Sequence, residues 1–256
     1  MKALRAALLA ALAPALCSQA ANVSDLLATP RKQIETADFR AVGHLVSVDK
    51  TGTRVSFPVT IKAHWFPGVL RIRVEIGQPT AAHREMREHI LLEMRPNGEN
   101  TIRIADPGDA TARELPFEKW SAHPLGPGFN YEDFLEQQYF WPGQSSQGKA
   151  KFGARDCDVV KSTPGPADRT HYAEVKTWID PSIGFPVYVE KTVKETGVVK
   201  QFTSYGVRKE QGQWSAHQIE VKTRGQAGST LLIFDRGSAK ANLTGADFNP
   251  EQLTRF

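Results

Sequence analysis

Cysteine, long apolar runs and an excess of one charge are all scarce in this sequence. Only two of its 256 residues are cysteines. Cys17 falls in an N-terminal segment that has the features of an export signal, so Cys157 is the one thiol expected in the mature chain. One thiol forms no intramolecular disulfide, so packing must stabilise the fold. Asp156 and Asp158 flank Cys157 and favour a raised thiol pKa, which predicts a packed side chain rather than a nucleophile.

The apolar run at the N-terminus is too short to span a membrane. Lys2 and Arg5 precede the apolar residues 6–16, and small residues occupy the −3 and −1 positions of a cleavage site that ends at Ala20. A large apolar residue stands before Cys17, which disfavours lipid attachment there. No later segment approaches the roughly 20 apolar residues that a membrane span needs. We therefore expect residues 1–20 to be a signal peptide, cleaved near Ala20, and the mature protein to be soluble in the periplasm.

The charge of the chain gives no support to nucleic acid binding. Lys and Arg number 32 against 28 Asp and Glu, a formal net charge of +4, which falls to +2 once Lys2 and Arg5 are removed. The remaining charges of both signs are mixed, as in residues 190–195, and this pattern is typical of a solvated face. We expect no nucleic acid among the partners.

Most of the chain shows the alternation of apolar and polar residues that predicts β-strands. Helix is expected only as one or two short turns over residues 24–36, which Pro30 interrupts, and over residues 130–137, with Asn130 as the cap. The strands are expected at residues 39–48, 54–64, 69–76, 90–94, 101–105, 150–152, 157–163, 172–179, 185–194, 198–207, 214–223 and 229–235. The loops between the later strands are too short for a parallel crossover, which predicts an antiparallel meander.

One face of this sheet is apolar. Val175 and Ile179 point to one side of their strand while Glu174 and Lys176 point to the other. Exposed apolar surface costs about 25 cal/mol per Å², so such a face must be covered. We therefore predict an α+β fold that is mostly β, in one domain over residues 21–256: a single large curved antiparallel sheet that forms a half-open barrel, covered by a few short helices.

The C-terminal strands carry a recognisable motif. The strand over residues 172–180 ends in Trp178-Ile179-Asp180, and the next strand begins with Gly184-Phe185-Pro186. This pair resembles a repeated element of the LolA/LolB-like outer-membrane lipoprotein-sorting superfamily. Residues 131–134 and 139–142 are similar to an upstream element in an uncharacterised bacterial branch of that superfamily. The resemblance covers residues 130–248, whereas the N-terminal half matches only by its strand pattern.

The resemblance implies a carrier whose apolar interior shelters the acyl chains of a lipoprotein or another lipid. Burial of an acyl chain gains about 0.8 kcal/mol per CH₂, so a dry concave sheet can hold one without polar contacts. The implied partners are a lipid or lipidated protein as cargo, an inner-membrane transporter and an outer-membrane acceptor, and the implied state is a monomer. A carrier must release its cargo, and residues 120–142 are our candidate for a movable lid. We match no arginine of this sequence to the one that holds the lid closed in well-studied carriers, which leaves open whether lipoprotein itself is the cargo.

Large aromatic side chains are the expected ligand contacts, although ordinary core packing remains the alternative for each of them. The candidates are Trp65, Phe66, Trp120, Phe134, Tyr139, Phe140, Trp141 and Trp178.

The motifs of common enzymes are missing. Residues 83–89 contain histidines and glutamates, but their spacing fits neither His-Glu-x-x-His nor its inverted form. The sequence has no Gly-x-Ser-x-Gly nucleophile turn, and solvated carboxylates explain Asp156 and Asp158. We therefore expect no catalytic residue, no metal and no cofactor. The alternative function is a non-enzymatic envelope-assembly scaffold that binds a protein partner, and a glycosidase or esterase is the third candidate.

Overall fold

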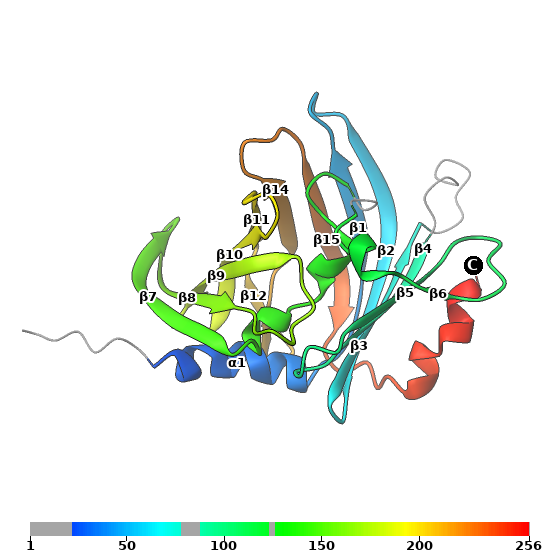
Figure 1. The fold of residues 1–256 in the computed structure, drawn as a ribbon, viewed down its shortest axis with the longest axis horizontal. Coiled ribbons are helices and arrows are strands. Elements are labelled where there is room, and N and C mark those ends of the chain that lie inside the picture. Colours follow the sequence, from blue (N-terminus) through cyan, green and yellow to red (C-terminus); the bar gives the residue numbers. More distant parts are fainter. Residues whose placement is uncertain (1–21, 78–87, 123–125, 256) are drawn as a thin grey trace, which may run out of the picture.

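The computed structural model describes residues 22–77, 88–122 and 126–255 (Figure 1). The expected signal peptide, Cys17 and most of the histidine-containing segment 83–89 lie outside these residues. The described elements comprise one α-helix, short 3₁₀ helices (η) and β-strands. They are α1 (Val23–Glu35), β1 (Asp38–Val48), β2 (Arg54–Phe66), β3 (Val69–Ile76), β4 (Glu88–Met94), β5 (Thr101–Ala105), β6 (Arg113–Glu114), η1 (Phe117–Lys119), η2 (Tyr131–Phe134), η3 (Gln137–Tyr139), β7 (Gly143–Phe152), β8 (Arg155–Thr163), β9 (Tyr172–Asp180), β10 (Phe185–Val193), β11 (Val199–Tyr205), β12 (Arg208–Glu210), β13 (Gln213–Ser215), β14 (Gln218–Thr223), β15 (Ser229–Ser238), η4 (Gly245–Phe248) and η5 (Pro250–Thr254).

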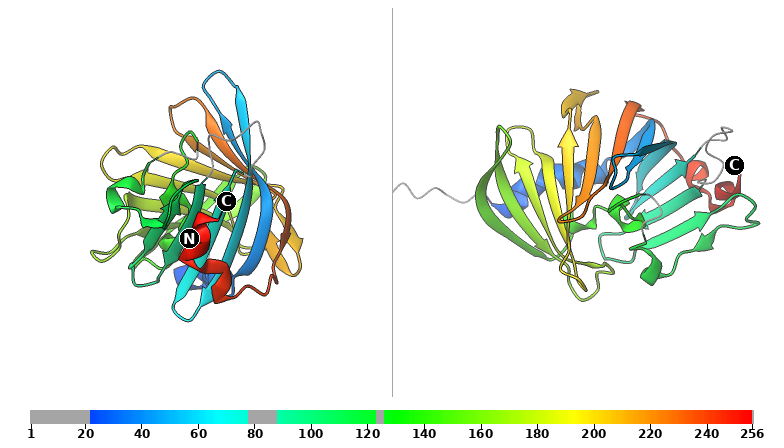
Figure 2. Two further views of the ribbon diagram at one scale, coloured as in Figure 1. Left: turned by 90° about the vertical axis from the view of Figure 1, so that its right-hand side faces the viewer. Right: turned by 90° about the horizontal axis from the view of Figure 1, so that it is seen from above.

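Thirteen strands form a single antiparallel sheet. Its order is β6-β5-β4-β3-β2-β1-β15-β14-β11-β10-β9-β8-β7, while β12 and β13 form a separate hairpin. The predicted mostly β fold with one large antiparallel sheet is confirmed. The sheet is strongly curved but does not close, because β6 and β7 are its two edges (Figures 1 and 2).

The sheet consists of two meanders that meet along β1 and β15. Each meander pairs strands that follow one another in the chain, apart from the excursion of β12 and β13. The seam between them joins strands near the two ends of the chain, with Arg40 opposite Ser238 and Val48 opposite Ser229. The register shifts at Val42/Gly43. A Cβ on Gly43 would lie 1.8 Å from the carbonyl oxygen of Ile233, so only glycine fits this close approach.

The topology forces one connection to cross the sheet. β6 and β7 are consecutive in the chain but lie at opposite edges, so the chain between them must traverse the molecule. Its described residues, 115–122 and 126–142, are here called the crossing segment. It contains η1, η2 and η3. The helix expected over residues 130–137 is wrong: Asn130 caps its first turn, but Leu135 adopts an extended conformation and divides the segment into two 3₁₀ turns.

The crossing segment and α1 cover the same face of the sheet, which we call the inner face. The main core lies there. It joins Leu27 and Ile34 of α1, Trp120 and Leu135 of the crossing segment, and strand residues such as Leu92. The opposite, outer face of β3–β5 is covered by η4 and η5 at the C-terminus (Figures 1 and 2). A second cluster there contains Leu91, Phe248 and Leu253.

Two elements differ most in length from the sequence prediction. α1 is one helix of 13 residues rather than separate turns. Asn22 caps it, and Pro30 is accommodated inside it because burial of Leu27 and Ile34 on either side outweighs one missing hydrogen bond. β7 begins at Gly143 instead of Ala150. Its first residues are polar because β7 is an edge strand, so apolar alternation could not reveal them.

Candidate ligand-binding interior

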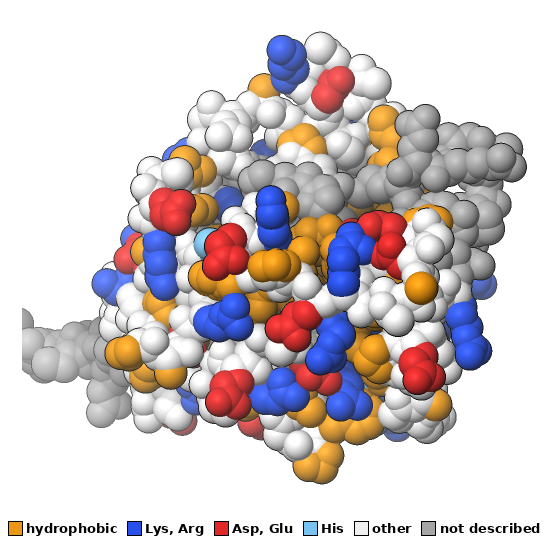
Figure 3. Space-filling view, turned by 45° about the vertical axis from the view of Figure 1, so that its right-hand side comes forward, with side chains coloured by type: hydrophobic (Ala, Val, Ile, Leu, Met, Phe, Trp, Pro, Cys, Tyr) orange, Lys and Arg blue, Asp and Glu red, His pale blue; other side chains and the backbone are white. Residues whose placement is uncertain are grey.

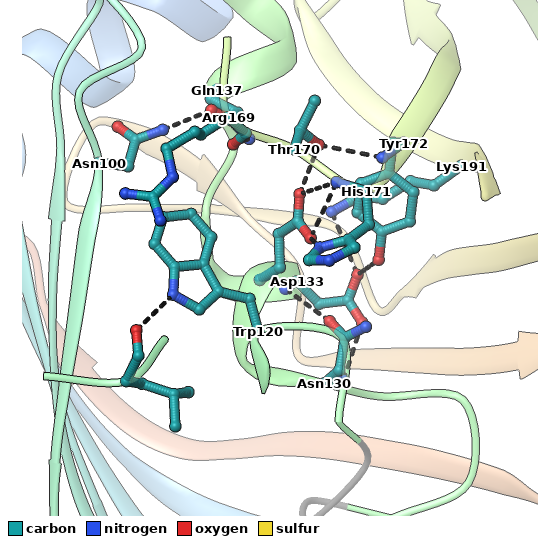
Figure 4. A network of polar contacts seen from close by, with 12 residues as sticks. Asn100, Trp120, Asn130, Asp133, Gln137, Arg169, Thr170, His171, Tyr172 and Lys191 are labelled. Atoms are coloured by element: carbon teal, nitrogen blue, oxygen red, sulfur yellow. Dashed lines mark hydrogen bonds and ion pairs between the residues drawn. The ribbon is translucent and has the colours of Figure 1, made fainter. Parts of the chain in front are cut away.

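Three consecutive residues of the crossing segment contact three different places in or next to the sheet. Tyr131, Glu132 and Asp133 form η2, with Asn130 as the cap: the Asn130 side chain accepts a hydrogen bond from the amide of Asp133 over 3.1 Å. The Tyr131 hydroxyl donates to Glu88 Oε1 at the start of β4 over 2.6 Å. Burial raises the pKa of Glu88 to about 7. Figure 4 shows how the neighbouring contacts converge on this turn.

Glu132 fixes the chain just before β9. Its carboxylate accepts hydrogen bonds from the hydroxyl of Thr170 and from the amide of His171, and His171 Nδ1 lies 2.8 Å from Glu132 Oε2 (Figure 4). The His171 ring stacks on Phe117 of η1, with ring centroids 4.1 Å apart. Glu132 therefore connects two parts of the crossing segment to the sheet.

Asp133 is the centre of a buried charge cluster on the inner face. Lys200 Nζ contacts Asp133 Oδ2, Lys191 Nζ lies 3.4 Å from Oδ1, and the Tyr172 hydroxyl donates to Oδ1 over 2.6 Å. The side chains of Asp133, Lys191 and Lys200 are 0%, 4% and 3% exposed. Burial alone would raise the pKa of Asp133, but the charges of Lys200 and Lys191 lower it overall. The carboxylate therefore stays ionised and holds both lysines.

Further polar contacts anchor the crossing segment at η3, the last of its three 3₁₀ helices. Gln137 accepts a hydrogen bond from the side chain of Asn100 and donates one to the carbonyl oxygen of Arg169 (Figure 4). Arg31 of α1 donates from Nε to the carbonyl oxygen of Tyr139 over 2.7 Å. Hydrogen bonds to the loops before β5 and β9, and to α1, thus hold η3 in place.

The inner face is completely buried on β4 and β5 but only partly buried near the middle of the sheet. On β4 and β5, Ile90, Leu92, Met94 and Ile102 are all fully buried at 0% exposure. Near the middle of the sheet, on β2, β11, β14 and β15, large apolar side chains on the same face are only partly buried. They are Phe57, Phe202, Ile219 and Phe234, here called the apolar wall. The described residues therefore cover this part of the inner face only partly.

Glu136, between η2 and η3, is an exposed residue near the buried charge cluster. Its side chain is exposed, yet desolvation by the surrounding protein raises its pKa, and the positive charge of the buried Lys191 opposes that rise. Within the described ranges no side chain forms a hydrogen bond or an ion pair with its carboxylate. The Glu136 carboxylate is therefore accessible and lies close enough to Lys191 for the lysine charge to influence its pKa.

The structure brings six of the eight predicted ligand-contact residues to the inner face. Trp65, Trp120, Phe134, Tyr139 and Phe140 belong to or pack against the main core, and Trp141 packs beside it with Tyr172 and Val175. The two remaining side chains lie on the outer face. Phe66 packs against Phe248, with ring centroids 5.7 Å apart, and Trp178 packs against Tyr188 at 4.9 Å. Contact of these eight residues with a ligand stays a prediction.

Sequence reasoning missed the buried lysines although a signal was present. Val187, Val189 and Val193 define the apolar side of β10, and Lys191 falls on the same side by strict alternation. A charged residue on an apolar face is rarely buried without a partner, so Lys191 implied an acidic group opposite. The chain offered many acids, and only the fold identifies Asp133 as the partner.

On the face of the molecule drawn in Figure 3, Lys and Arg side chains lie among Asp and Glu side chains. Residues 22–77, 88–122 and 126–255 contain no group of three or more His, Cys, Asp or Glu side chains placed to hold a metal ion. No helix in that part of the chain combines the length and apolar character needed to cross a bilayer. Cys157 is buried, and burial raises its thiol pKa.

Comparison with solved structures identifies the fold. An outer-membrane lipoprotein-sorting protein domain from Vibrio parahaemolyticus is 19% identical with a TM-score of 0.79, covering 91% of this chain and 100% of its own. A DUF1329 family protein from Desulfovibrio piger is 17% identical with a TM-score of 0.76, covering 90% and 96%. A LolA superfamily protein from Nitrosomonas europaea is 15% identical with a TM-score of 0.65, covering 90% and 99%.

Sequence comparison identifies the family. A search of curated proteins found no match. A family model matches residues 94–255, more than half of the chain, and its description reads "Uncharacterized protein". The resemblance to the LolA/LolB-like superfamily, inferred above from the C-terminal strands, is confirmed by the shared fold. The chain belongs to the family whose model covers residues 94–255, and it has the LolA-like fold of outer-membrane lipoprotein-sorting domains.

Proposed function

We propose that this protein is a non-enzymatic periplasmic carrier or binding protein for the acyl chains of a lipoprotein or another lipid, which it moves toward the outer membrane. The observation that carries the proposal is the apolar wall, where Phe57, Phe202, Ile219 and Phe234 remain partly exposed near the middle of the inner face. Partly exposed apolar side chains on a concave surface are what an acyl chain requires. The similarity to lipoprotein-sorting domains supports the same function.

In this proposal the curved sheet acts as a half-open barrel and the crossing segment acts as its lid. The lid closes over the inner face through the contacts of η2 and η3, and Arg31 links it to α1. A ligand chain enters between the lid and the apolar wall. Release requires these contacts to break or shift, which an inner-membrane transporter and an outer-membrane acceptor would exploit at loading and unloading.

Apolar burial alone supplies enough free energy for such binding. Covering about eight CH₂ groups gains about 6 kcal/mol, because each contributes about 0.8 kcal/mol. No polar contact is required, which fits a wall formed by phenylalanine and isoleucine. The charged groups beside the wall, which lie over the Phe202 ring, are already engaged with one another, since Asp133 holds Lys191 and Lys200.

Native mass spectrometry of the protein purified from its own periplasm tests the proposal. We expect a mass increment from a co-purified lipid, released by organic extraction and identified by its fragments. A stoichiometric protein partner without any lipid would instead favour the envelope-assembly scaffold. The delipidated protein should also bind a fluorescent naphthylamine probe, and added fatty acid should displace it. Failure of both measurements would rule out carriage of acyl chains by this monomer.

A further inference from the structure

A pocket lies on the outer face, away from the proposed lipid site. It has a volume of about 470 Å³ and is open to solvent. Arg71 of β3, Glu93 of β4 and Arg103 of β5 form one side, and residues 245–246 and 248–250 form the other. The lipid proposal uses none of these residues, so the pocket requires an explanation of its own.

The one carboxylate that lines this pocket, Glu93, already accepts hydrogen bonds at both of its oxygens. Glu93 Oε1 accepts a hydrogen bond from Arg71 Nε over 2.9 Å, and Oε2 accepts one from Arg95 Nη2 over 3.0 Å. Burial alone would raise the pKa of Glu93, but its bonds to Arg95 and Arg71 lower it overall. The Glu93 side chain is 10% exposed. It therefore orients the arginines and has little capacity left to bind a cation.

The two pocket arginines keep donors available. Arg71 uses Nε for Glu93, and the described residues provide no hydrogen-bond acceptor for its two terminal nitrogens. The nearest acid to Arg103 in the described part of the chain is the exposed Glu114, at 4.0 Å from Nη2. Both arginines remain about one-third exposed, at 32%. A guanidinium group offers several N–H donors in one plane, which suits the oxygens of a phosphate.

We propose that this outer pocket binds a phosphate group carried by a small polar molecule or by a lipid head group, with Arg71 and Arg103 as its two ligands. β3 and β5 are separated by one strand, hence by about 10 Å, so two long side chains can converge on one group from either side of Glu93. The pocket exceeds the size of a bare phosphate, so its remaining volume accommodates the moiety to which the phosphate is attached. The C-terminal segment closes one side of the site.

The binding test uses three probes: inorganic phosphate, glycerol 3-phosphate, and vesicles that contain phosphatidylglycerol beside phosphatidylcholine. Isothermal titration and vesicle sedimentation are compared for the unmodified protein, Arg103→Gln and Arg40→Gln. Arg40 is an exposed arginine on the outer face of β1, outside the pocket, and serves as the matched control. Arg103 has only a distant exposed partner, so its replacement leaves the fold intact. Circular dichroism melting verifies this.

We expect glycerol 3-phosphate to bind more tightly than inorganic phosphate, and Arg103→Gln to weaken both by about tenfold, as loss of a charge-assisted hydrogen bond does. Arg40→Gln should change neither. Vesicle binding that Arg103→Gln abolishes, without binding of the soluble probes, would identify a lipid head group as the source of the phosphate. Equal weakening by both variants would indicate non-specific attraction and overturn the proposal, as would the absence of binding to all three probes.

Discussion

Arg31 in α1 and Tyr139 in the crossing segment are joined by a hydrogen bond from Nε to the carbonyl oxygen, over 2.7 Å. The bond links the helix that begins the described chain to the segment proposed as the lid. Replacement by Gln shortens the side chain and should cost about 1–2 kcal/mol of unfolding free energy. Hydrogen exchange of the amides in residues 137–141 should accelerate, whereas exchange in β4 should not. Unchanged exchange around Tyr139 in Arg31→Gln would show that this contact does not hold the segment closed.

A charge placed on the apolar wall should prevent lipid retention. In Ile219→Glu a carboxylate would face the space proposed for the acyl chain, and its desolvation would oppose binding. Native mass spectrometry should detect at least a tenfold lower lipid occupancy than in the unmodified protein. Tyr205→Glu is the matched control, because Tyr205 is a 45% exposed side chain on the other side of the neighbouring strand. Equal occupancy in both variants would exclude the wall as the binding surface.

Removal of the carboxylate at Asp133 should be among the most damaging single changes in the chain. Asp133→Ala leaves Lys191 and Lys200 buried without their shared partner. Breaking a buried ion pair in this way costs about 3–5 kcal/mol. Urea unfolding of this variant should be compared with Asp156→Ala, which removes an exposed carboxylate whose side chain is 80% exposed. A loss below about 1 kcal/mol would mean that water already reaches the lysines.

Stability should fall as the pH rises through the titration of Glu88. Burial raises the pKa of this carboxyl to about 7, so between its usual value of 4.5 and pH 7 the folded state binds more protons than the unfolded state. The free energy of unfolding should therefore decrease over this window, by about 2–3 kcal/mol from this group. Glu88→Gln stays neutral and should flatten the dependence. Glu114→Gln, an exposed control on β6, should leave it unchanged. A slope equal to that of the unmodified protein in Glu88→Gln would contradict the raised pKa.

The seam between the meanders should tolerate no side chain at Gly43. A methyl group there would overlap the carbonyl oxygen of Ile233, so Gly43→Ala must shift β1 away from β15. Overpacking of this kind costs about 1–3 kcal/mol. Gly237→Ala on the same strand pair is the control, because its Cβ would meet no atom closer than 3.4 Å. Thermal melting measures both, and equal melting temperatures would show that the bulge absorbs the methyl group.

Apolar alternation predicted the sheet well because most strands bury one face and expose the other. It failed where a strand does not bury one face and expose the other, and where tertiary contacts override the local preference for helix. β7 is a polar edge strand, and η2 is shaped by side-chain bonds from Tyr131, Glu132 and Asp133 rather than by helical pattern. These acids lie within a motif that the sequence did highlight, but their partners are up to 67 residues away. Such pairings depend on tertiary contacts that local sequence does not encode.

The sequence also predicted the position of some candidate site residues and not of others. Aromatic content points to the crossing segment, and the structure places Trp120, Tyr139 and Trp141 on the inner face, while their contact with a ligand stays a prediction. Phe66 and Trp178 were also expected as ligand contacts because they are large and aromatic, but their positions along the strands place them on the outer face. Arg31 was overlooked because its partner is a backbone oxygen, which any residue carries.

The seam between β1 and β15 has a consequence for biogenesis. While the chain is being made, or threaded unfolded across a membrane, each meander has an unpaired edge until the last strand arrives. Closure over so long a loop is slow, because contacts between distant residues carry a large entropic barrier. Folding of this protein should therefore finish only after almost the whole polypeptide has emerged, and during that delay the unpaired edges of β1 and of the second meander are open to aggregation.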